Sequence, residues 1–149
     1  MLTLLNEIGR LLEDRETFVL ATILSHSGST PRTSGAKMLI RAGGQILGTV
    51  GGGLLEAQVI SRAPSIFESR CTCVEHFSLD ADTADSMDMI CGGSLSVLLE
   101  FIAADQGNRQ LFAGLKKMAD KRMAGLVVTP IPDASQRELP SEKCLLGPD

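Results

Sequence analysis

The chain has 149 residues and a formal net charge of −4, and its 44% hydrophobic and 21% charged residues are typical of one packed globular domain. Aromatic residues make up only 3%, without Trp or Tyr, so the stacking platforms and basic excess of nucleic-acid-binding proteins are missing and we expect no nucleic-acid partner. No apolar run reaches the roughly 18 residues that cross a bilayer, and the first residues lack a basic signal-peptide segment, so we expect a cytoplasmic protein without a membrane span.

The N-terminal third of the chain predicts one helix followed by three strands. Leu4, Ile8 and Leu11 recur at the spacing of one helix face, which indicates an amphipathic helix. The next apolar run is continuous, which is typical of a strand buried on both faces, so we place it at the centre of a sheet. The predicted elements are a helix over 3–14, a strand over 18–24, a loop over 25–35, and hairpin strands over 36–41 and 45–50.

The remainder of the chain predicts two more helices and four strands. A helical repeat of apolar residues begins after Gly53 and meets Pro64, which lacks a backbone donor and should end or kink that helix. Four aspartates crowd residues 80–88 without an apolar period, which predicts a loop. The further predicted elements are a helix over 108–118 and strands over 71–79, 94–102, 126–129 and 143–146.

These elements predict an α/β fold, a mixed β-sheet covered by helices, with a partial internal repeat. Sliding the chain by 107 residues lays the first helix on the helix that follows residue 107, Arg15 on Arg122, and Val19 on Leu126. Few residues are identical, so a chance likeness of two helix–strand patterns is an equal alternative. We divide the chain into a domain over 1–104 and a helix–strand extension of the same compact unit over 105–149, which would be a truncated second repeat.

Three consecutive glycines, Gly51–Gly53, lie between a predicted strand and a predicted helix, with Glu56 in the first turn of that helix. Bare backbone N–H groups at a helix N-terminus can hold a phosphate or another anion. Leu54 and Leu55 stand where a P-loop requires Lys and Ser or Thr, so nucleoside triphosphate hydrolysis is disfavoured. An anion site and a tight turn that needs positive φ explain the glycines equally well.

Cysteine chemistry, if the chain uses it, is expected at Cys91. This residue precedes Gly92 and Gly93 just before a predicted strand, where a thiol can face a ligand, and a small buried hydrophobe is the alternative. We expect all four cysteines to be free thiols, because the sequence shows no secretion signal. Cys71 and Cys73 would share one face of a strand, and without a second ligand pair they favour core packing over zinc.

The other polar residues give weaker signals. The aspartates of 80–88 do not fit an EF-hand, and neither His26 nor His76 has an Asp or Cys at a spacing that indicates a catalytic triad, so we expect no metal site and no triad. Arg32 differs, because it lies in a hydroxyl-rich loop at one end of the predicted sheet, where a guanidinium could clamp a phosphate. A solvated surface arginine is the alternative.

Four blocks stand in order along the chain: residues 27–32 (SGSTPR), 35–39 (GAKML), 48–57 (GTVGGGLLEA) and 89–93 (MICGG). Together they resemble the XdhC/CoxI family of xanthine dehydrogenase accessory proteins, and the resemblance covers residues 17 to about 102. It implies a molybdenum cofactor chaperone, which binds the pyranopterin, supports exchange of an oxo for a sulfido ligand on molybdenum, and hands the product to an apo molybdenum hydroxylase.

The resemblance also implies which residues form the site and which partners take part. Cys91 would be a thiol close to molybdenum and the tentative catalytic residue, whereas Leu54 stands where family members commonly carry Cys. A cysteine desulfurase, a separate Rossmann-like chain and a second copy in a homo-oligomer are the further expected partners. The cofactor contacts implied by position are Ser29, Arg32, Gly51, Gly52, Gly53, Glu56, Cys91, Gly92 and Gly93.

Two alternatives to an accessory protein of this kind stay open. A thiol-dependent sulfurtransferase using Cys91 would require a depressed thiol pKa and turnover with a persulfide donor. A non-catalytic assembly module would have lost cofactor binding together with the thiol that Leu54 replaces. Pterin and molybdenum content would separate the chaperone from the assembly module.

Overall fold

The structure, a computed structural model, describes residues 2–28, 32–78, 93–131 and 143–147. The chain forms two compact units, which we name by their place in the sequence. The central unit is Val19–Phe101, and the terminal unit combines Met1–Phe18 with Ile102–Asp149. The predicted boundary at residue 104 stays a prediction.

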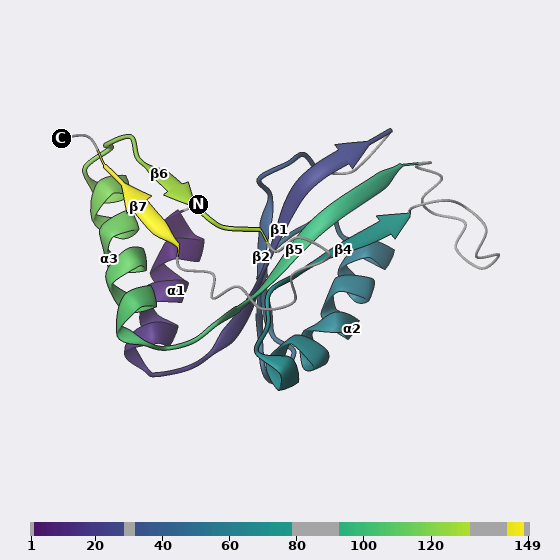
Figure 1. The fold of residues 1–149 in the computed structure, drawn as a ribbon, viewed down its shortest axis with the longest axis horizontal. Helices are drawn as coiled ribbons and strands as arrows, with labels where there is room; N and C mark the ends of the chain where they lie inside the picture. Colours follow the sequence, from purple (N-terminus) through teal and green to yellow (C-terminus); the bar gives the residue numbers. More distant parts are fainter. Residues whose placement is uncertain (1, 29–31, 79–92, 132–142, 148–149) are drawn as a thin grey trace. The chain divides into compact units, whose positions relative to one another are not determined.

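A five-stranded sheet with the order β3-β2-β1-β5-β4 forms the frame of the central unit (Figure 1). The pairs β2–β3 and β4–β5 are antiparallel. The predicted central strand is confirmed, because β1 occupies the middle of the sheet and its first six residues are buried. The elements are β1 (Phe18–Ser27), β2 (Lys37–Arg41), β3 (Ile46–Gly48), α2 (Gly53–Ser69), β4 (Cys73–Ser78) and β5 (Ser94–Ile102).

The core of the central unit lies between the sheet and α2. Val19, Ala21 and Ile23 alternate along β1 and belong to one buried cluster, as the two-residue period of a strand requires. The helix contributes residues of one face to the same cluster, namely Leu55, Val59, Ala63 and Ile66. Burial of this apolar surface is the main stabilising term of the unit.

Two predicted element ends in the central unit are wrong, and each has a local reason. The helix does not end at Pro64 but continues to Ser69, because Pro64 lies on the exposed side while Ala63 and Ile66 are buried on the core side. The packing of that face offsets the one hydrogen bond that proline removes. Strand β3 ends at Gly48 rather than at Val50, because Gly48 has φ of 86°, which departs from strand geometry.

The terminal unit contains α1 (Leu2–Glu13), α3 (Gln106–Asp120) and the antiparallel strands β6 (Leu126–Val128) and β7 (Cys144–Leu146). The helices α1 and α3 contact each other, and both bury an apolar face. Asp105 caps α3, since its Oδ1 accepts a hydrogen bond from the backbone N–H of Asn108 at 2.8 Å. The mixed α/β class predicted from the sequence is confirmed.

The two helices of the terminal unit end in the same way. Arg15 and Arg122, which are 107 residues apart, both have positive φ, 61° and 55°. The N–H of Glu16 donates to the carbonyl oxygen of Leu11, and the N–H of Met123 donates to that of Met118, at 2.8 and 2.9 Å. These are the hydrogen bonds of a Schellman motif, in which a left-handed residue closes the last turn. A common origin of the two segments stays a prediction.

Candidate functional site

The predicted site residues that the structure describes fall on connections at one end of the central sheet. The register places Met38 opposite Gly48, so β2 begins where β3 ends, and Ser78 opposite Ser94, so β5 begins where β4 ends. Figure 1 shows the ends of β1 and β4 and the start of β5 on the same side of the sheet. The glycine turn, the bend that holds Arg32, and Gly93 therefore belong to neighbouring connections.

The glycine turn has a backbone that only glycine adopts without strain. Gly51, Gly52 and Gly53 have φ of 143°, 79° and 56°, and Gly52 combines its φ with ψ of 177°. A Cβ placed on Gly52 would meet no heavy atom of the described structure within 4 Å. Because Gly53 and the following Leu54 are exposed, the first turn of α2 is open to an approaching group. The geometry is therefore compatible with both interpretations of the glycines, a tight turn that needs positive φ and an anion site with an accessible backbone.

Glu56 turns back from α2 and closes this glycine turn with its own carboxylate. Its Oε1 accepts a hydrogen bond from the backbone N–H of Gly52 at 2.9 Å and another from the Thr49 hydroxyl. Thr49 Oγ1 in turn accepts from the N–H of Gly51 at 3.0 Å. The negative charge lies at the positive end of the helix dipole, where it is stabilised. The start of α2 thus already holds an anionic oxygen, and any incoming anion has to compete with it for Gly52.

The contact between Thr49 and Glu56 is a feature of the site that sequence reasoning missed. The sequence placed Glu56 in the first turn of the helix but did not pair it with a group across the glycines. The sequence does contain a signal for this contact: a hydroxyl residue ends the strand, and an acidic residue lies in the first turn of the next helix. Both side chains can reach the backbone N–H groups at the start of that helix, which have no partner within the helix.

The connection from β1 to β2 carries the other polar groups near this end. Arg32 is exposed in a bend, in agreement with a position where a guanidinium can reach solvent-borne anions. His26, which we treated as isolated, lies with Nδ1 3.2 Å from Ser34 Oγ. Lys37 Nζ donates to the buried Thr22 hydroxyl at 2.9 Å, which anchors the start of β2. His76 likewise pairs with Ser96 at 2.9 Å, on the strands β4 and β5.

Several predicted site residues lie outside the described residues, namely Ser29, Cys91 and Gly92, as does the acidic segment over 80–88. Gly93 is described, and it is buried immediately before β5. Leu54, which stands where the resemblance implied a thiol, is 45% exposed in the first turn of α2. An apolar side chain therefore faces outward where a thiol had been the family expectation.

The predicted pair of thiols on one strand face is wrong for Cys71. The strand begins only at Cys73, and Cys71 is exposed before it, so the two do not share a strand face. Cys73 is half-buried against the hydrophobic cluster of the central unit. Burial, and secondarily the negative charge of Glu75, raise the pKa of the Cys73 thiol. Core packing is thus confirmed for Cys73 alone.

The described ranges contain neither a cluster of metal ligands nor a membrane-spanning helix. No group of three or more His, Cys, Asp or Glu side chains in these ranges is arranged to hold a metal ion. None of the helices described is both long and apolar enough to cross a membrane.

Comparisons with known proteins bear on this geometry. The model of the XdhC and CoxI family matches residues 11–78, which include β1 to β4 and α2. Over 98 residues the chain is 37% identical to the uncharacterized protein YqeB of Escherichia coli, covering 66% of this chain and 18% of that protein. Over 126 residues it is 29% identical to a probable xanthine dehydrogenase subunit of Bacillus subtilis, covering 83% of this chain and 37% of that protein.

A solved structure has a similar fold. The crystal structure of a xanthine dehydrogenase from Bacillus halodurans matches with a TM-score of 0.65 and 27% sequence identity, over 87% of this chain and 39% of that chain. The chain therefore spans 18% to 39% of the length of these three proteins.

Proposed function

Because residues 11–78 belong to the XdhC and CoxI family, we propose that this chain acts in the maturation of a xanthine dehydrogenase-type enzyme. In this proposal the chain binds the molybdenum cofactor at the glycine turn Gly51–Gly53 and presents it for sulfuration and insertion into an apo molybdenum hydroxylase. The cofactor is the cargo of the protein. It carries the molybdenum whose oxo ligand is exchanged for a sulfido ligand.

The observation that carries this proposal is the anion-holding start of α2. The family match covers Arg32, the glycine turn and Glu56, so the residues with suitable chemistry lie inside the matched segment. A phosphate of the cofactor is an anion, as the Glu56 carboxylate is, and the N–H of Gly52 already donates to an anionic oxygen. Open space beside Gly52 leaves room for a larger group than a carboxylate. The backbone N–H of Gly52 and the open space beside it are therefore chemically suited to a phosphate group.

Exchange of one anion for another would bind the cargo reversibly. In the free protein the Glu56 carboxylate occupies the N–H of Gly52, and a phosphate would take that donor while Glu56 keeps the Thr49 hydroxyl. Arg32 would add a charge-assisted hydrogen bond from the neighbouring connection. Because the loop is held in shape by Glu56 before binding, little ordering remains to be done when the cargo arrives.

The sulfur contact to molybdenum is assigned in this proposal to Cys91. Leu54 supplies no thiol at the first turn of α2, and Cys91 precedes the buried Gly93 at the start of β5, at the same end of the sheet. Delivery would require the hydroxylase, a sulfur donor such as a cysteine desulfurase, and a separate Rossmann-like chain as partners.

The test is the cofactor content of the protein itself. The chain is produced in a bacterial host that makes the cofactor, and pterin fluorescence and molybdenum are measured on the purified protein. We expect both to copurify with the unaltered chain and to be lost in Gly52→Ala. Gly44→Ala is the matched control, since Gly44 also has φ of 79° and a Cβ there would likewise meet no described atom within 4 Å.

Each result of this experiment has a stated meaning. Pterin in the unaltered chain and in Gly44→Ala, but not in a folded Gly52→Ala, supports the site. A folded unaltered chain without pterin or molybdenum contradicts cofactor binding and favours the assembly module. Equal pterin in both glycine variants would place the cofactor elsewhere on the chain.

A further inference from the structure

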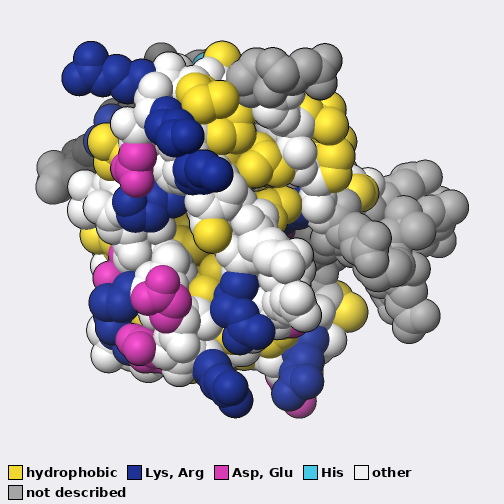
Figure 2. Space-filling view, turned by 90° about the vertical axis from the view of Figure 1, so that its left-hand side faces the viewer, with side chains coloured by type: hydrophobic (Ala, Val, Ile, Leu, Met, Phe, Trp, Pro, Cys, Tyr) yellow, Lys and Arg dark blue, Asp and Glu magenta, His cyan; other side chains and the backbone are white. Residues whose placement is uncertain are grey.

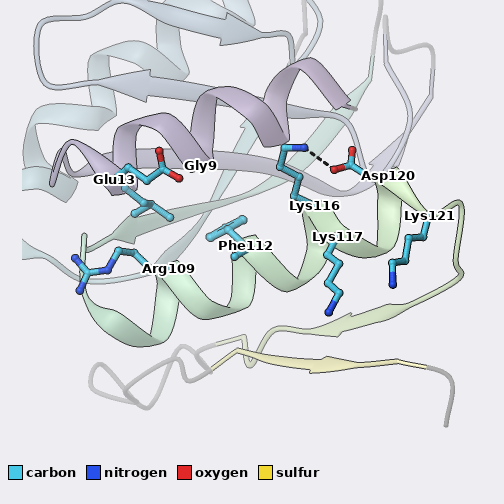
Figure 3. Close-up of a pocket in the computed structure, with 10 residues that line it drawn as sticks. Gly9, Glu13, Arg109, Phe112, Lys116, Lys117, Asp120 and Lys121 are labelled. Atoms are coloured by element: carbon cyan, nitrogen blue, oxygen red, sulfur yellow. Dashed lines mark hydrogen bonds and ion pairs between the residues drawn. The ribbon is translucent and has the colours of Figure 1, made fainter.

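The two helices of the terminal unit, α1 and α3, leave a groove between them, which Figure 3 shows in close-up. The groove has a volume of about 490 Å³, and both helices contribute to its lining. Its apolar part consists of Gly9 and Leu12 from α1 and of Phe112 and Ala113 from α3. We call this cavity the helix groove. Its size and its largely apolar lining are those of a site for a small molecule.

Gly9 keeps the middle of the helix groove open. It lies inside α1, where glycine is a poor helix former, and it does not have positive φ. A Cβ on Gly9 would meet no heavy atom of the described structure within 4 Å, whereas a Cβ on Gly114 of α3 would be 2.7 Å from Leu145 Cδ2. Close packing therefore explains Gly114 but not Gly9. A glycine that weakens its helix without serving packing or an unusual φ indicates that the space beside it is used by another group.

One end of the helix groove is basic. Lys116, Lys117 and Lys121 line this end together with a single acidic residue, Asp120, which pairs with Lys116 at 2.6 Å. Figure 3 shows Lys116 pointing toward α1, and Lys117 and Lys121 extending from α3 away from α1. On the face of the molecule shown in Figure 2, Lys and Arg side chains likewise lie next to hydrophobic ones. A ligand that reaches this end of the groove therefore meets an excess of positive charge.

The opposite end of the helix groove is balanced in charge. Glu13, the last residue of α1, and Arg109, in the first turn of α3, lie at this end in Figure 3. Because α1 ends where α3 begins, the two helix dipoles oppose each other at both ends, and the charged side chains determine the local sign. An anionic group is therefore attracted to the lysine end, and the rest of its molecule extends from there over Gly9.

The length and the lining of the helix groove define the rest of the ligand. Arg109 and Lys116 are two helical turns apart on α3, so the groove runs for roughly 10 Å along this helix. The side chains between its charged ends, Leu12, Phe112 and Ala113, offer no hydrogen-bonding group. A polar heterocycle would lose hydrogen bonds to water there, whereas an alkyl chain would lose none. The middle of the groove thus favours hydrocarbon.

We propose that the helix groove binds an amphiphilic anion that consists of an unbranched alkyl chain and one carboxylate or phosphate head group. The alkyl chain lies over Gly9 and Phe112, and the head group contacts Lys117 and Lys121. A chain of about eight to ten carbons matches the roughly 10 Å of the groove. The helix groove belongs to the terminal unit and the glycine turn to the central unit, so the failure of either proposal leaves the other intact.

The experiment is a calorimetric titration of the full chain with alkyl ions at concentrations at which they do not form micelles. The probes are decanoate and decyl phosphate, with hexanoate as the control for chain length and decylammonium as the control for charge. We expect saturable binding of a ten-carbon anion and at least about tenfold weaker binding of hexanoate, because each methylene adds buried apolar area. Decylammonium should also bind at least about tenfold more weakly, because the lysine end repels it.

Gly9→Leu is the variant that tests the position of the alkyl chain. Its side chain fills the helix groove, and leucine is a better helix former than glycine, so the melting temperature should stay the same or rise. Binding of the ten-carbon anion should fall at least about tenfold. Thr3→Leu is the matched control, since Thr3 is exposed on α1, does not line the groove and receives the same side chain. It should leave binding unchanged.

Charge variants test the position of the head group. Lys117→Glu/Lys121→Glu should weaken the ten-carbon anion at least about tenfold and strengthen decylammonium, because the sign of the charge at this end is reversed. Arg109→Gln at the balanced end should change anion binding by less than about threefold. Circular dichroism verifies that each variant is folded.

Each outcome supports or overturns the proposal. Anion binding that is lost in Gly9→Leu and retained in Thr3→Leu, together with opposite effects of the charge reversal on anion and cation, supports it, and the tighter of the two anions identifies the head group. Absence of saturable binding, equal binding of anion and cation, or an unfolded Gly9→Leu chain overturns it. A dimer in sedimentation velocity that Gly9→Leu converts to a monomer also overturns it, because a second copy of the chain would then occupy the groove.

Discussion

Strand β1 of the central unit and strand β6 of the terminal unit follow the same local pattern yet have different surroundings. Each strand follows a helix that ends at an arginine with positive φ, Arg15 before β1 and Arg122 before β6. In the terminal unit the antiparallel strand β7 pairs with β6. The first six residues of β1 are buried, whereas β6 and β7 expose every residue of one face. Apolar strands of similar composition thus become core in one unit and surface in the other.

This difference shows that burial of an apolar strand residue depends on the helix or strand that packs on it and not on the strand sequence alone. In the central unit α2 closes over the sheet, and the same helix begins at the glycine turn. The same helix therefore covers the core with its apolar face and forms the candidate anion site at its N-terminus. In the terminal unit α3 covers the side of the hairpin that carries Leu145, whereas Leu126, Val128 and Leu146 on the other side are exposed.

The largest expected contrast is between a buried apolar residue of β2 and an exposed apolar residue of β7. Ile40 in β2 is 1% exposed, and Leu146 in β7 is 52% exposed. Ile40→Ala should lower the free energy of unfolding by about 2–5 kcal/mol, because it leaves a cavity in the core. Leu146→Ala should change it by no more than about 0.5 kcal/mol. Urea denaturation of both variants checks this, and similar losses would mean that Leu146 is buried in solution.

The next contrast concerns the backbone beneath the glycine turn. Gly48 has φ of 86°, and a Cβ there would collide with the carbonyl oxygen of Lys37. Gly48→Ala should therefore cost about 3 kcal/mol of stability, and Gly44→Ala, with a similar φ but open space, about 1 kcal/mol. Thermal unfolding of the two variants gives the comparison. Equal losses would show that the contact with Lys37 is relieved easily.

Arg32→Ala tests the ligand end of the central unit, with a lysine of the terminal unit as the control. Removing a charge-assisted hydrogen bond should weaken binding of a metal-free phosphorylated pterin roughly ten- to hundredfold. Lys121→Ala, directly after α3 of the terminal unit, should leave pterin binding unchanged. Calorimetric titration of both variants tests this pair, and an unchanged dissociation constant in Arg32→Ala would remove Arg32 from the site.

Thiol labelling also distinguishes the two units, because a bound ligand slows alkylation only of the cysteines that it covers. Cys91 should be alkylated faster than the half-buried Cys73, whose raised pKa leaves less thiolate at neutral pH. Bound pterin should slow labelling of Cys91 and not of the exposed Cys144 of the terminal unit. Mass spectrometry of the labelled peptides reads out each site. Protection of Cys71 by pterin would instead contradict the assignment of Cys91.

The sequence was most informative where a local period determines the element. The strand predicted over 94–102 is β5, and the helix predicted over 3–14 is α1 within one residue at each end. The continuation of α2 through Pro64 was not predictable locally, because it depends on burial of Ala63 and Ile66 against distant strands. Long-range packing overrides a local breaker in this case.

The candidate site shows the same limit. Consecutive glycines after a strand identified the turn and the start of α2, and the hydroxyl-rich loop at the end of the predicted sheet indicated Arg32. The sequence did not indicate that the Glu56 carboxylate turns back to Gly52, since this depends on the path of three residues with positive φ. Nor did it show that the strands predicted at 126–129 and 143–146 pair with each other and expose Leu126, Val128 and Leu146, because pairing and exposure depend on contacts between distant segments.

The most direct test of the account is the effect of Glu56→Gln on pterin affinity. Glutamine keeps an oxygen that can accept from Gly52 and Thr49 but lacks the negative charge that an incoming phosphate has to displace. Titration with the metal-free phosphorylated pterin should therefore give about three- to tenfold tighter binding than the unaltered chain. Weaker binding in a folded Glu56→Gln protein would contradict the anion exchange, since Glu56 would then be a direct contact of the cofactor.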